Sequence, residues 1–382
     1  MKVSDLRGQS LKTPCYVYDK QGIQCVLDVI NEIAACANVK FLYSIKAANN
    51  VGLLEFIQPN VHGFSCSSLN ELRLANEILQ DEQSLHVTSP IYKNSEWTSV
   101  HQLADFVSIN SLSQWQALTA EGYGNASLGI RFNPELSFVK DSRYDPCHPG
   151  SKLGVNAFEL KEAIDSKIIV SEQIRGIHVH NNCESIDFSE WQRTIERLLK
   201  IITDLKIRPD WINLGGGYLF HDSEYKQLIG ILKSFKAQVD SDIYIEPGKA
   251  VVGHTGYLVA SVIDIKKSEQ GNIAILDSSI NHLPEVFEYQ YQPAVLDSQK
   301  NGNHHYKLAG CTCLSGDLFG EYTFEQPLSI GDRIIFDHVG AYMQVKANWF
   351  NGVNQAATYL FDETAKQFEL IMKYDYEDFR RR

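Results

Sequence analysis

The sequence has few of the features that would place the protein on a membrane, outside the cell or on nucleic acid. Its N-terminal MKVSDLRGQS contains no apolar core of a secretory signal, and no stretch approaches the ~18 uninterrupted apolar residues of a membrane helix. Among 382 residues, 35 are Lys or Arg and 47 are Asp or Glu, so the net charge is −12. Because nucleic-acid binding depends on clustered Lys and Arg, we predict neither nucleic acid nor a membrane as a partner. The acidity is compatible with a cationic small molecule, although it can also serve solubility alone.

Cysteines are scattered and lack the spacing of a metal site. The eight cysteines include no Cys-x2-Cys pair. Together with the absence of an export signal, this predicts reduced thiols in a cytoplasmic protein, while the even count still permits disulfides. Cys311 and Cys313 could begin a zinc site only with His304 and His305, and we predict no metal.

Short apolar runs alternate with helical patterns over residues ~35–250. Ser68-x-x-Glu71 and Ser189-x-x-Gln192 have the form of capping boxes, which begin helices. About eight strand–helix units fit this length, and such units require a parallel sheet with functional groups at the carboxyl ends of its strands. We therefore predict an α/β fold with a (β/α)8 TIM barrel rather than an open sheet. The predicted strands include 39–43, 128–132, 174–180, 211–214 and 243–245, and the predicted helices include 53–57, 191–205 and 224–235.

A C-terminal, mostly β domain is predicted after the barrel. Strand-like segments at 257–264, 272–276 and 333–336 are separated by Gly, Pro and Asn. Near the N-terminus, Cys15–Tyr18 is another predicted strand, and it could add to either domain. We assign residues 21–254 to the barrel, and residues 1–20 with 255–382 to the β domain.

Three segments at strand ends have residues suited to binding a small molecule. Lys46 follows an early apolar strand, where it could attack a carbonyl as a free amine or simply extend into solvent. Gly215–Gly217 lies between a predicted strand and a predicted helix, so it could close around a phosphate or form only a turn. It matches neither the ATP-binding nor the dinucleotide-binding motif. In Glu246-Pro247-Gly248, the carboxylate could hydrogen-bond a ring nitrogen and the glycine could approach a phosphate, or the segment could be a common Pro-Gly turn.

Two further segments add polar groups. His178 and His180 alternate along a strand, so one could stack on a flat ring; the alternatives are the metal site of a barrel hydrolase and a buried structural pair. Cys313 could donate or accept a proton, and Asp317 could hold a substrate ammonium or only cap its turn. The order from lysine through histidine, glycine loop and Glu-Pro-Gly to cysteine and Gly340-Ala341-Tyr342 fits one ligand with an aldehyde, a planar ring, a ring nitrogen and a phosphate. That ligand is pyridoxal 5′-phosphate (PLP).

This ordered set resembles the barrel-type, alanine-racemase-like (fold III) PLP-dependent decarboxylases over nearly the whole chain. It is most similar to the branch that acts on carboxynorspermidine and carboxyspermidine. The resemblance implies PLP-dependent decarboxylation of a carboxylated polyamine in polyamine (spermidine) biosynthesis. The motifs that carry it are Asn110-Ser111 through Gln114-Trp115-Gln116, Tyr144-Asp145-Pro146-Cys147, Cys183-Glu184, Gly256–Ala260, Cys313–Asp317 and Phe350–Asn354.

The resemblance also implies roles for individual residues. Lys46 would bind the cofactor aldehyde covalently, and Cys313 would be a second catalytic residue that reaches the neighbouring subunit's site in a homodimer with shared active sites. His180 would stack on the ring, and Glu246 would keep the ring nitrogen protonated. Asp317 is the first candidate for contact with the distal amine of a small cationic amino-acid or polyamine substrate. The remaining implied residues are Gly215, Gly216, Gly217, Gly248 and Tyr342 around the phosphate, and Glu184, Asp145 and Asp277 near the substrate.

Several residues depart from the pattern of that branch. Asn49 and Gly340-Ala341-Tyr342 look more like the diaminopimelate or general decarboxylases, while Asn181-Asn182 and Lys249 replace residues that are usual there. These changes leave open a decarboxylase of another diamino acid such as diaminopimelate. A fold III racemase agrees less well, because the Cys313 segment counts against it. A catalytically inactive regulator agrees less well because both implied catalytic residues are present.

Overall fold

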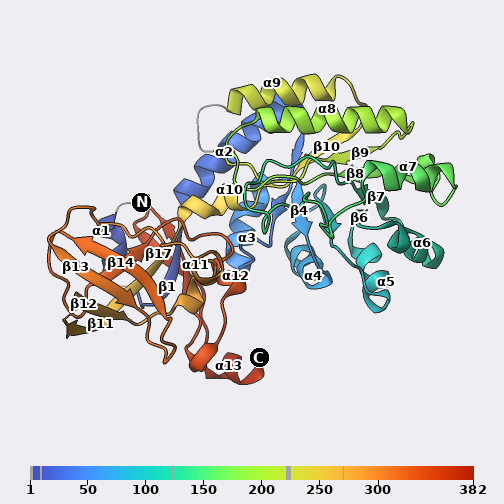
Figure 1. Ribbon diagram of the computed structural model, residues 1–382. Coiled ribbons are helices and arrows are strands. Elements are labelled where there is room, and N and C mark those ends of the chain that lie inside the picture. Colours follow the sequence, from blue (N-terminus) through green and yellow to red (C-terminus); the bar gives the residue numbers. More distant parts are fainter. Residues whose placement is uncertain (1–2, 9–10, 123, 221–224, 270) are drawn as a thin grey trace. The chain divides into compact units, whose positions relative to one another are not determined.

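The chain forms two sheets, one parallel and one mixed (Figure 1). This computed structural model describes residues 3–8, 11–122, 124–220, 225–269 and 271–382. Residue contacts divide the chain into two compact units, and each unit combines separate stretches of sequence. We call Val26–Lys46 with Leu54–Ala250 the barrel unit, and Met1–Cys25 with Ala47–Leu53 and Val251–Arg382 the sheet unit.

The barrel unit contains parallel strands in the order β2-β10-β9-β8-β7-β6-β5-β4-β3. β2 (Lys40–Phe41) pairs with β10 (Asp242–Ile245), and β3 (Tyr43–Ser44) pairs with β4 (Gly63–Cys66). Only Leu42 separates β2 from β3, and its N–H donates to the carbonyl of Ile245 over 2.8 Å. The predicted strand 39–43 is therefore two short strands of one segment, and eight segments form a nearly closed barrel. The predicted (β/α)8 fold is confirmed.

Each strand of the barrel from β3 onward is followed by a helix, as parallel neighbours require. Glu224, the predicted first residue of one helix, lies outside the described residues. The other strands are β5 (Ser84–Thr88), β6 (Phe106–Ile109), β7 (Ser127–Arg131), β8 (Gly176–His178) and β9 (Trp211–Asn213). The helices along this part of the chain are α2 (Lys20–Ala37), α3 (Val51–Ile57), α4 (Leu69–Ile78), α5 (Asn94–Leu103), α6 (Leu112–Glu121), α7 (Ala157–Asp165), α8 (Ser189–Asp204), α9 (Tyr225–Lys236) and α10 (Lys249–Val252).

The two predicted capping boxes have different outcomes. The Ser68 hydroxyl accepts a hydrogen bond from the N–H of Glu71 and caps α4, as predicted. The Glu71 carboxylate accepts from the N–H of Ser67 rather than from that of Ser68, so only this half of the predicted box is formed. At α8 the prediction was wrong, because the N-cap is Phe188 and the N–H of Ser189 instead donates to the Asp187 carboxylate over 2.9 Å. The side-chain hydrogen-bond acceptor at the start of α8 is therefore the Asp187 carboxylate, two residues before the predicted Ser189.

Aromatic side chains fill the inside of the barrel near the start of several strands. His86 stacks on Phe106 with a centroid distance of 4.2 Å, and Trp211 and Tyr244 pack against the same pair. A Cβ atom at Gly176 would lie 1.8 Å from the Trp211 ring, so only glycine fits there. These rings form one packed aromatic cluster on strands β5, β6, β9 and β10.

The sheet unit contains a mixed eight-stranded sheet, which confirms the predicted mostly β domain. β1 (Cys15–Asp19) pairs antiparallel with β11 (Gly256–Ser268) and parallel with β16 (Ala357–Asp362). Cys15, Val17 and Phe361 are buried in its core. The other elements are β12 (Gly271–Leu276), β13 (His304–Ala309), β14 (Leu318–Phe324), β15 (Arg333–Phe336), β17 (Gln367–Met372), α1 (Val3–Leu6), α11 (Pro284–Tyr289), α12 (Met343–Lys346) and α13 (Tyr376–Arg381).

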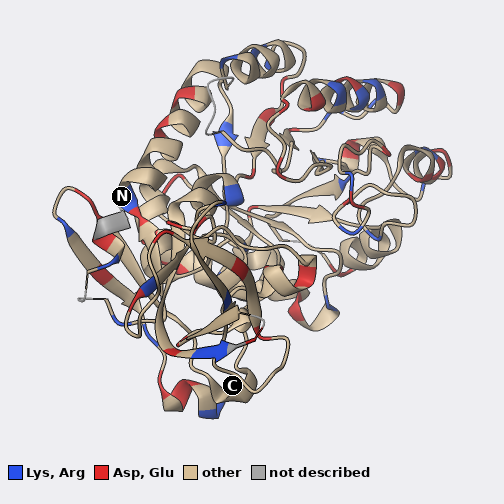
Figure 2. Ribbon diagram, turned by 60° about the vertical axis from the view of Figure 1, so that its left-hand side comes forward, with Lys and Arg blue, Asp and Glu red and all other residues tan. Residues whose placement is uncertain are grey.

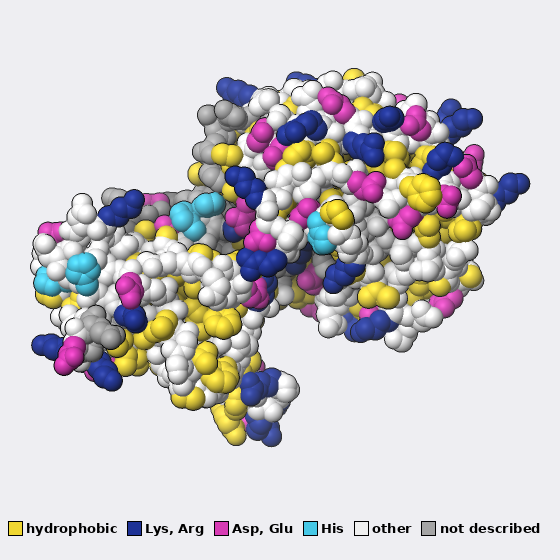
Figure 3. All heavy atoms as spheres, in the orientation of Figure 1, with side chains coloured by type: hydrophobic (Ala, Val, Ile, Leu, Met, Phe, Trp, Pro, Cys, Tyr) yellow, Lys and Arg dark blue, Asp and Glu magenta, His cyan; other side chains and the backbone are white. Residues whose placement is uncertain are grey.

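The surface carries charges of both signs. Acidic and basic positions are interspersed along the ribbon in Figure 2. On the face shown in Figure 3, hydrophobic side chains lie in patches between charged ones. Within the described ranges, every helix is too short or too polar to cross a membrane.

Candidate active site

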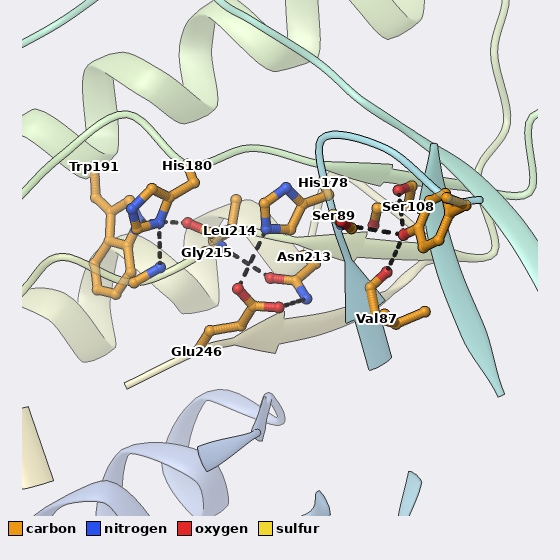
Figure 4. A network of polar contacts seen from close by, with 12 residues as sticks. Val87, Ser89, Ser108, His178, His180, Trp191, Asn213, Leu214, Gly215 and Glu246 are labelled. Atoms are coloured by element: carbon orange, nitrogen blue, oxygen red, sulfur yellow. Dashed lines mark hydrogen bonds and ion pairs between the residues drawn. The ribbon is translucent and has the colours of Figure 1, made fainter. Parts of the chain in front are cut away.

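A buried polar network lies at the carboxyl ends of three neighbouring barrel strands (Figure 4). His178 ends β8, Asn213 ends β9, and Glu246 directly follows β10. The Glu246 carboxylate lies 3.2 Å from His178 Nε2 through one oxygen and accepts a hydrogen bond of 2.7 Å from Asn213 Nδ2 through the other. All three side chains are buried. The parallel register brings these residues together, because parallel strands end at the same edge.

Glu246 is ionised although it is buried. Burial by itself raises the pKa of this carboxyl, but His178, Lys46 and Ser65 more than offset that effect and hold the pKa below its ordinary value. Burial lowers the pKa of His178, against the opposing effect of Glu246. We therefore assign a neutral His178 whose Nε2–H donates to an ionised Glu246. The network thus holds one buried negative charge.

His180 lies just beyond β8, on the same segment as His178. Its Nδ1 accepts a hydrogen bond of 3.0 Å from the N–H of Gly216. Burial, followed by the charge of Lys46, holds its pKa well below the ordinary value. Its ring is therefore neutral, with the remaining proton on Nε2. A neutral imidazole is suited to stacking on a flat ring, which is the role predicted for it and stays a prediction.

The glycine loop follows β9 and turns through conformations that favour glycine. The φ angles are +66° at Gly215 and +91° at Gly217, and a Cβ at Gly217 would lie 2.3 Å from the carbonyl oxygen of Asn182. The N–H of Gly215 donates to Asn213 Oδ1 over 2.9 Å, and that of Gly216 donates to His180. Two of the three N–H groups are thus used within the protein. Contact of this loop with a phosphate stays a prediction.

Lys46 lies two residues beyond β3, at the carboxyl end of the same barrel. Its side chain is exposed, whereas Ile45 and Ala47 on either side are buried. Its charge acts on both Glu246 and His180, as their pKa shifts require. The amine is therefore accessible and close to the network, as its predicted covalent role requires, although that role stays a prediction.

Other predicted residues of the barrel unit already have partners. Gly248 is buried, just before α10. Lys249 Nζ lies 2.6 Å from the Glu184 carboxylate, so a cationic substrate would have to displace Lys249 from this carboxylate. Asp145 accepts a hydrogen bond of 2.8 Å from the N–H of Cys147 and shapes its own loop.

Cys313 belongs to the sheet unit and lies on the exposed loop between β13 and β14. Its N–H donates to the side-chain oxygen of Asn351 over 3.0 Å, and its sulfur lies 3.1 Å from the same atom. Asn351 itself has a φ of +55°. Two of the motifs that carried the family resemblance are therefore joined by a single asparagine, which holds the thiol in place.

Asp317 is saturated by contacts within the sheet unit. Its side chain is buried and accepts hydrogen bonds from the Ser279 hydroxyl, the Ile280 N–H, and both the N–H and the hydroxyl of Thr312. Of the two alternatives for Asp317, this arrangement favours the one in which it organises its turn. Contact with a substrate ammonium stays a prediction.

Asp277 and Tyr342 complete the predicted set. Asp277 accepts hydrogen bonds from the Thr13 hydroxyl at 2.6 Å and from the N–H of Ser261 at 2.8 Å, and burial raises its pKa. Tyr342 has a left-handed backbone (φ +64°), and its N–H donates to the carbonyl of Ala47 over 2.8 Å. This bond links the Gly-Ala-Tyr turn to the residue that follows Lys46.

Sequence reasoning missed three residues. Asn213 and Asn351 were quoted only as parts of a strand and a motif, and Arg131 only as part of a strand. Arg131 is buried at the end of β7, and its charge acts on both His178 and His180. A polar residue at the end of an otherwise apolar strand was the available signal for Asn213 and Arg131.

The described groups together fit a ligand with a cationic ring nitrogen and an aldehyde. An ionised buried carboxylate, a neutral imidazole and an accessible amine converge on one end of the barrel. A carboxylate stabilises a protonated ring nitrogen, and an amine combines with an aldehyde. In the described part of the chain, no group of three or more His, Cys, Asp or Glu side chains is placed to hold a metal ion.

Known proteins share this architecture and about a third of the residues. A family model described as pyridoxal-dependent decarboxylase, C-terminal sheet domain, matches residues 15–340. The carboxyaminopropylagmatine decarboxylase of Synechocystis sp. is 33% identical, over 98% of this chain and 96% of its own length. The carboxynorspermidine/carboxyspermidine decarboxylase of Herminiimonas arsenicoxydans is 32% identical, over 97% of this chain and 98% of its own. The crystal structure of carboxynorspermidine decarboxylase from Campylobacter jejuni, complexed with norspermidine, has a TM-score of 0.84 at 29% identity, and covers 97% of this chain and 99% of that one.

Proposed function

Because the chain belongs to the family of pyridoxal-dependent decarboxylases, we propose that it removes the carboxylate from an amino acid that carries a polyamine chain, namely carboxynorspermidine or carboxyspermidine. The observation that carries this proposal is the full-length likeness to decarboxylases that act on carboxylated polyamines. The cofactor of the family is PLP. The ionised Glu246, the neutral His180 and the accessible Lys46 fit that cofactor.

The barrel unit would hold the cofactor. When bound, PLP supplies a ring that accepts the electron pair left behind when carbon dioxide departs. Lys46 would hold the aldehyde carbon, and Glu246 would keep a proton on the ring nitrogen. His180 would cover one face of the ring, while Gly217 and Gly248 would contact the phosphate; the resemblance adds Tyr342, which belongs to the sheet unit. These roles rest on the positions and charge states described above.

The sheet unit would supply the proton. The Cys313 thiol is exposed, and Asn351 holds it in a defined position. We infer that this thiol delivers a proton to the carbon that has lost its carboxylate. The predicted homodimer, in which Cys313 serves the partner subunit's site, is part of this proposal and has a direct test given below.

The substrate's amines require negative charge. Glu184 is the predicted acid with the clearest access, because it is about half exposed and its partner Lys249 is a mobile type of side chain. If a substrate ammonium displaced the Lys249 side chain, Glu184 would still be paired with one positive charge. Carboxyaminopropylagmatine is a second candidate substrate, because the Synechocystis relative acts on it and is as similar as the others.

The test is a substrate panel, with Lys46→Ala as the variant that should be inactive. Carbon dioxide release is measured from carboxynorspermidine, carboxyspermidine, carboxyaminopropylagmatine and diaminopimelate, and the amine product is identified by mass spectrometry. We expect the highest kcat/KM for one of the first two. Turnover confined to diaminopimelate would overturn the substrate assignment and leave the reaction type intact.

Borohydride reduction tests the cofactor link separately. The reduced protein should carry a pyridoxyl group on Lys46, and Lys46→Ala should carry none and lose decarboxylation. Lys249→Ala is the control, since this lysine also lies in the barrel unit and is not predicted to react. A pyridoxyl group on any other residue would contradict the assignment of Lys46.

A further inference from the structure

We propose that Asn213 is a positioning residue that fixes the spacing between the Glu246 carboxylate and the glycine loop. The inference rests on the proposed cofactor site and adds a residue for which neither the family resemblance nor the comparisons give a role. It starts from the two hydrogen bonds that the Asn213 side chain makes in opposite directions (Figure 4).

The orientation of the Asn213 amide is determined by its partners. The backbone N–H of Gly215 can only donate, so the amide atom 2.9 Å from it must be the oxygen. The amide nitrogen therefore faces Glu246 Oε1 at 2.7 Å, as a donor to an acceptor. The side chain has no solvent exposure, so no water competes for either bond. Both ends of one rigid planar group are thus used.

Backbone contacts make this bridge stiff. The N–H of Glu246 donates to the carbonyl of Gly215 over 2.7 Å. A Cβ at Gly216 would lie 2.3 Å from the carbonyl oxygen of Glu246, so the loop lies directly against the end of β10. The backbone of Asn213 is held in place as well, because its carbonyl accepts a hydrogen bond from the N–H of Val179. The loop, the carboxylate and the segment of His180 are therefore one connected unit.

Such spacing matters because the proposed ligand is rigid. In pyridoxal 5′-phosphate the ring nitrogen and the carbon that bears the phosphate arm are two positions apart on one rigid ring, so the nitrogen and the phosphate must meet their partners at once. Groups that bind or react must be held within about 0.5 Å of the productive geometry. The Asn213 amide bonds both to Glu246 and to the glycine loop, so one side chain fixes the distance between the two groups that would meet the ring nitrogen and the phosphate.

The amide also suits the charge of Glu246. Its N–H donates to the ionised carboxylate, and hydrogen bonds to charged groups are stronger than those between neutral groups. An aspartate at this position could still accept from Gly215 but would place a second carboxylate against Glu246. One of the two acids would then keep a proton at a pH where Glu246 is normally ionised.

The experiment compares Asn213→Asp with Asn110→Asp as a matched control. Asn110 is another buried bridging amide of the barrel unit, since it donates to the carbonyl of Lys152 and accepts from the N–H of Gly154, both over 2.8 Å. Cofactor affinity is measured by release from the holoenzyme and by titration back, and the pH dependence of the cofactor absorbance and of kcat is recorded. Thermal unfolding is measured with and without cofactor.

We expect Asn213→Asp to weaken cofactor binding by about 10- to 100-fold and to move the acid limb of the kcat profile upward by about one pH unit. Asn110→Asp should lower thermal stability without moving that limb. In the double variant Asn213→Asp with Glu246→Gln, the amide and the carboxylate exchange places. Thermal stability should recover relative to Asn213→Asp, while the kcat profile should not.

Three results separate the possible failures. If Asn213→Asp only lowers thermal stability, as Asn110→Asp does, and leaves cofactor affinity and the pH profile unchanged, the positioning role is wrong. If the double variant recovers no stability, Asn213 and Glu246 are not coupled and the role is also wrong. If the native protein carries no pyridoxyl group at Lys46 after reduction, the proposed cofactor site fails independently of Asn213.

Discussion

The barrel unit and the sheet unit treat buried carboxylates differently. In the barrel unit, Glu246 is bonded to His178 and Asn213, and the charge of the exposed Lys46 acts on it, so its negative charge remains available to a ligand. In the sheet unit, Asp317 accepts four hydrogen bonds, all from groups of the same unit. The half-buried Asp277 accepts two, as Glu246 does.

This difference teaches that an acid near a predicted site is not by itself a ligand for a cation. A carboxylate with every acceptor position filled stabilises its own turn, because removal of those bonds costs more than one ammonium contact returns. The carboxylates that remain candidates for the substrate amines are those with a single exchangeable partner, such as Glu184.

The largest expected effect is at Glu246, where Glu246→Gln should lower kcat by about 10²- to 10³-fold. The neutral amide keeps the shape but removes the charge that retains a proton on the ring nitrogen. Steady-state kinetics measure the change. Glu159→Gln is the control, since Glu159 is an acid of the barrel unit that accepts from the N–H of Asn156 at the start of α7, and it should affect stability alone. Equal losses of kcat in both variants would contradict the distinction.

The second prediction concerns Cys313 and the homodimer. Cys313→Ala should lower kcat by about 10²-fold or more, because the proton donor is lost. If subunits share sites, mixing Cys313→Ala with Lys46→Ala should restore about a quarter of native activity, since half the dimers are mixed and each has one complete site. Sedimentation measures the dimer in the same samples. No recovery after verified subunit exchange would place both residues in the site of one subunit.

Asp317→Asn should have a moderate effect on stability and little on substrate binding. The amide can keep some of the four hydrogen bonds but presents an N–H to donors, so unfolding free energy should fall by about 2 kcal/mol. Denaturant titration measures this change, and KM should change less than twofold. By contrast, Glu184→Gln should raise KM. A large rise of KM in Asp317→Asn with unchanged stability would restore it as a substrate contact.

The last comparison is between two buried histidines, and it concerns the loss of stability at acid pH. Burial lowers the pKa of His86 to about 3, and its Nε2 has no hydrogen-bond partner among the described residues. Burial lowers the pKa of His282 in the sheet unit to about 4, but both of its nitrogens have partners. Each folded-state pKa lies below the ordinary 6.5, so the unfolded chain takes up protons first as pH falls. Stability is therefore full above about pH 6.5 and declines below it.

His86→Phe should remove part of this decline. Between pH 7 and pH 4, His86 contributes a loss of about 3 kcal/mol, which phenylalanine cannot show because it does not titrate. Urea titrations across this pH range measure it. His282→Phe should instead cost stability already at pH 7, because Ser278 and the carbonyl of Asn354 lose their partner. Parallel pH curves for native protein and His86→Phe would show that His86 does not control acid sensitivity.

The sequence was sufficient for the architecture and for the family. Alternating strand and helix patterns led to the barrel, and the ordered motifs led to the decarboxylase family, and both are confirmed. Local details followed the sequence less closely. Leu42 divides the first strand because its N–H pairs with Ile245. At the start of α8 the N–H of Ser189 donates to Asp187, which lies before the predicted box.

Charge states and hydrogen-bond partners could not be read from residue types. The ionised state of Glu246 depends on His178 and Lys46, which are distant in sequence, and the saturation of Asp317 depends on Ser279 and Thr312. The order of residues along the chain predicted which strand ends and loops carry these side chains. Which of their atoms already have hydrogen-bond partners is decided by the packing of the folded chain.

The assignment of Ala47–Leu53 to the sheet unit has a practical consequence for protein engineering. The backbone passes between the units after Cys25, after Lys46, after Leu53 and after Ala250, so neither unit is an uninterrupted length of polypeptide. A truncated gene that encodes only the barrel would have to omit the segment immediately after Lys46 and rejoin the chain there. Fusion partners and truncations are therefore best placed at the two ends of this sequence, where no such splice is required.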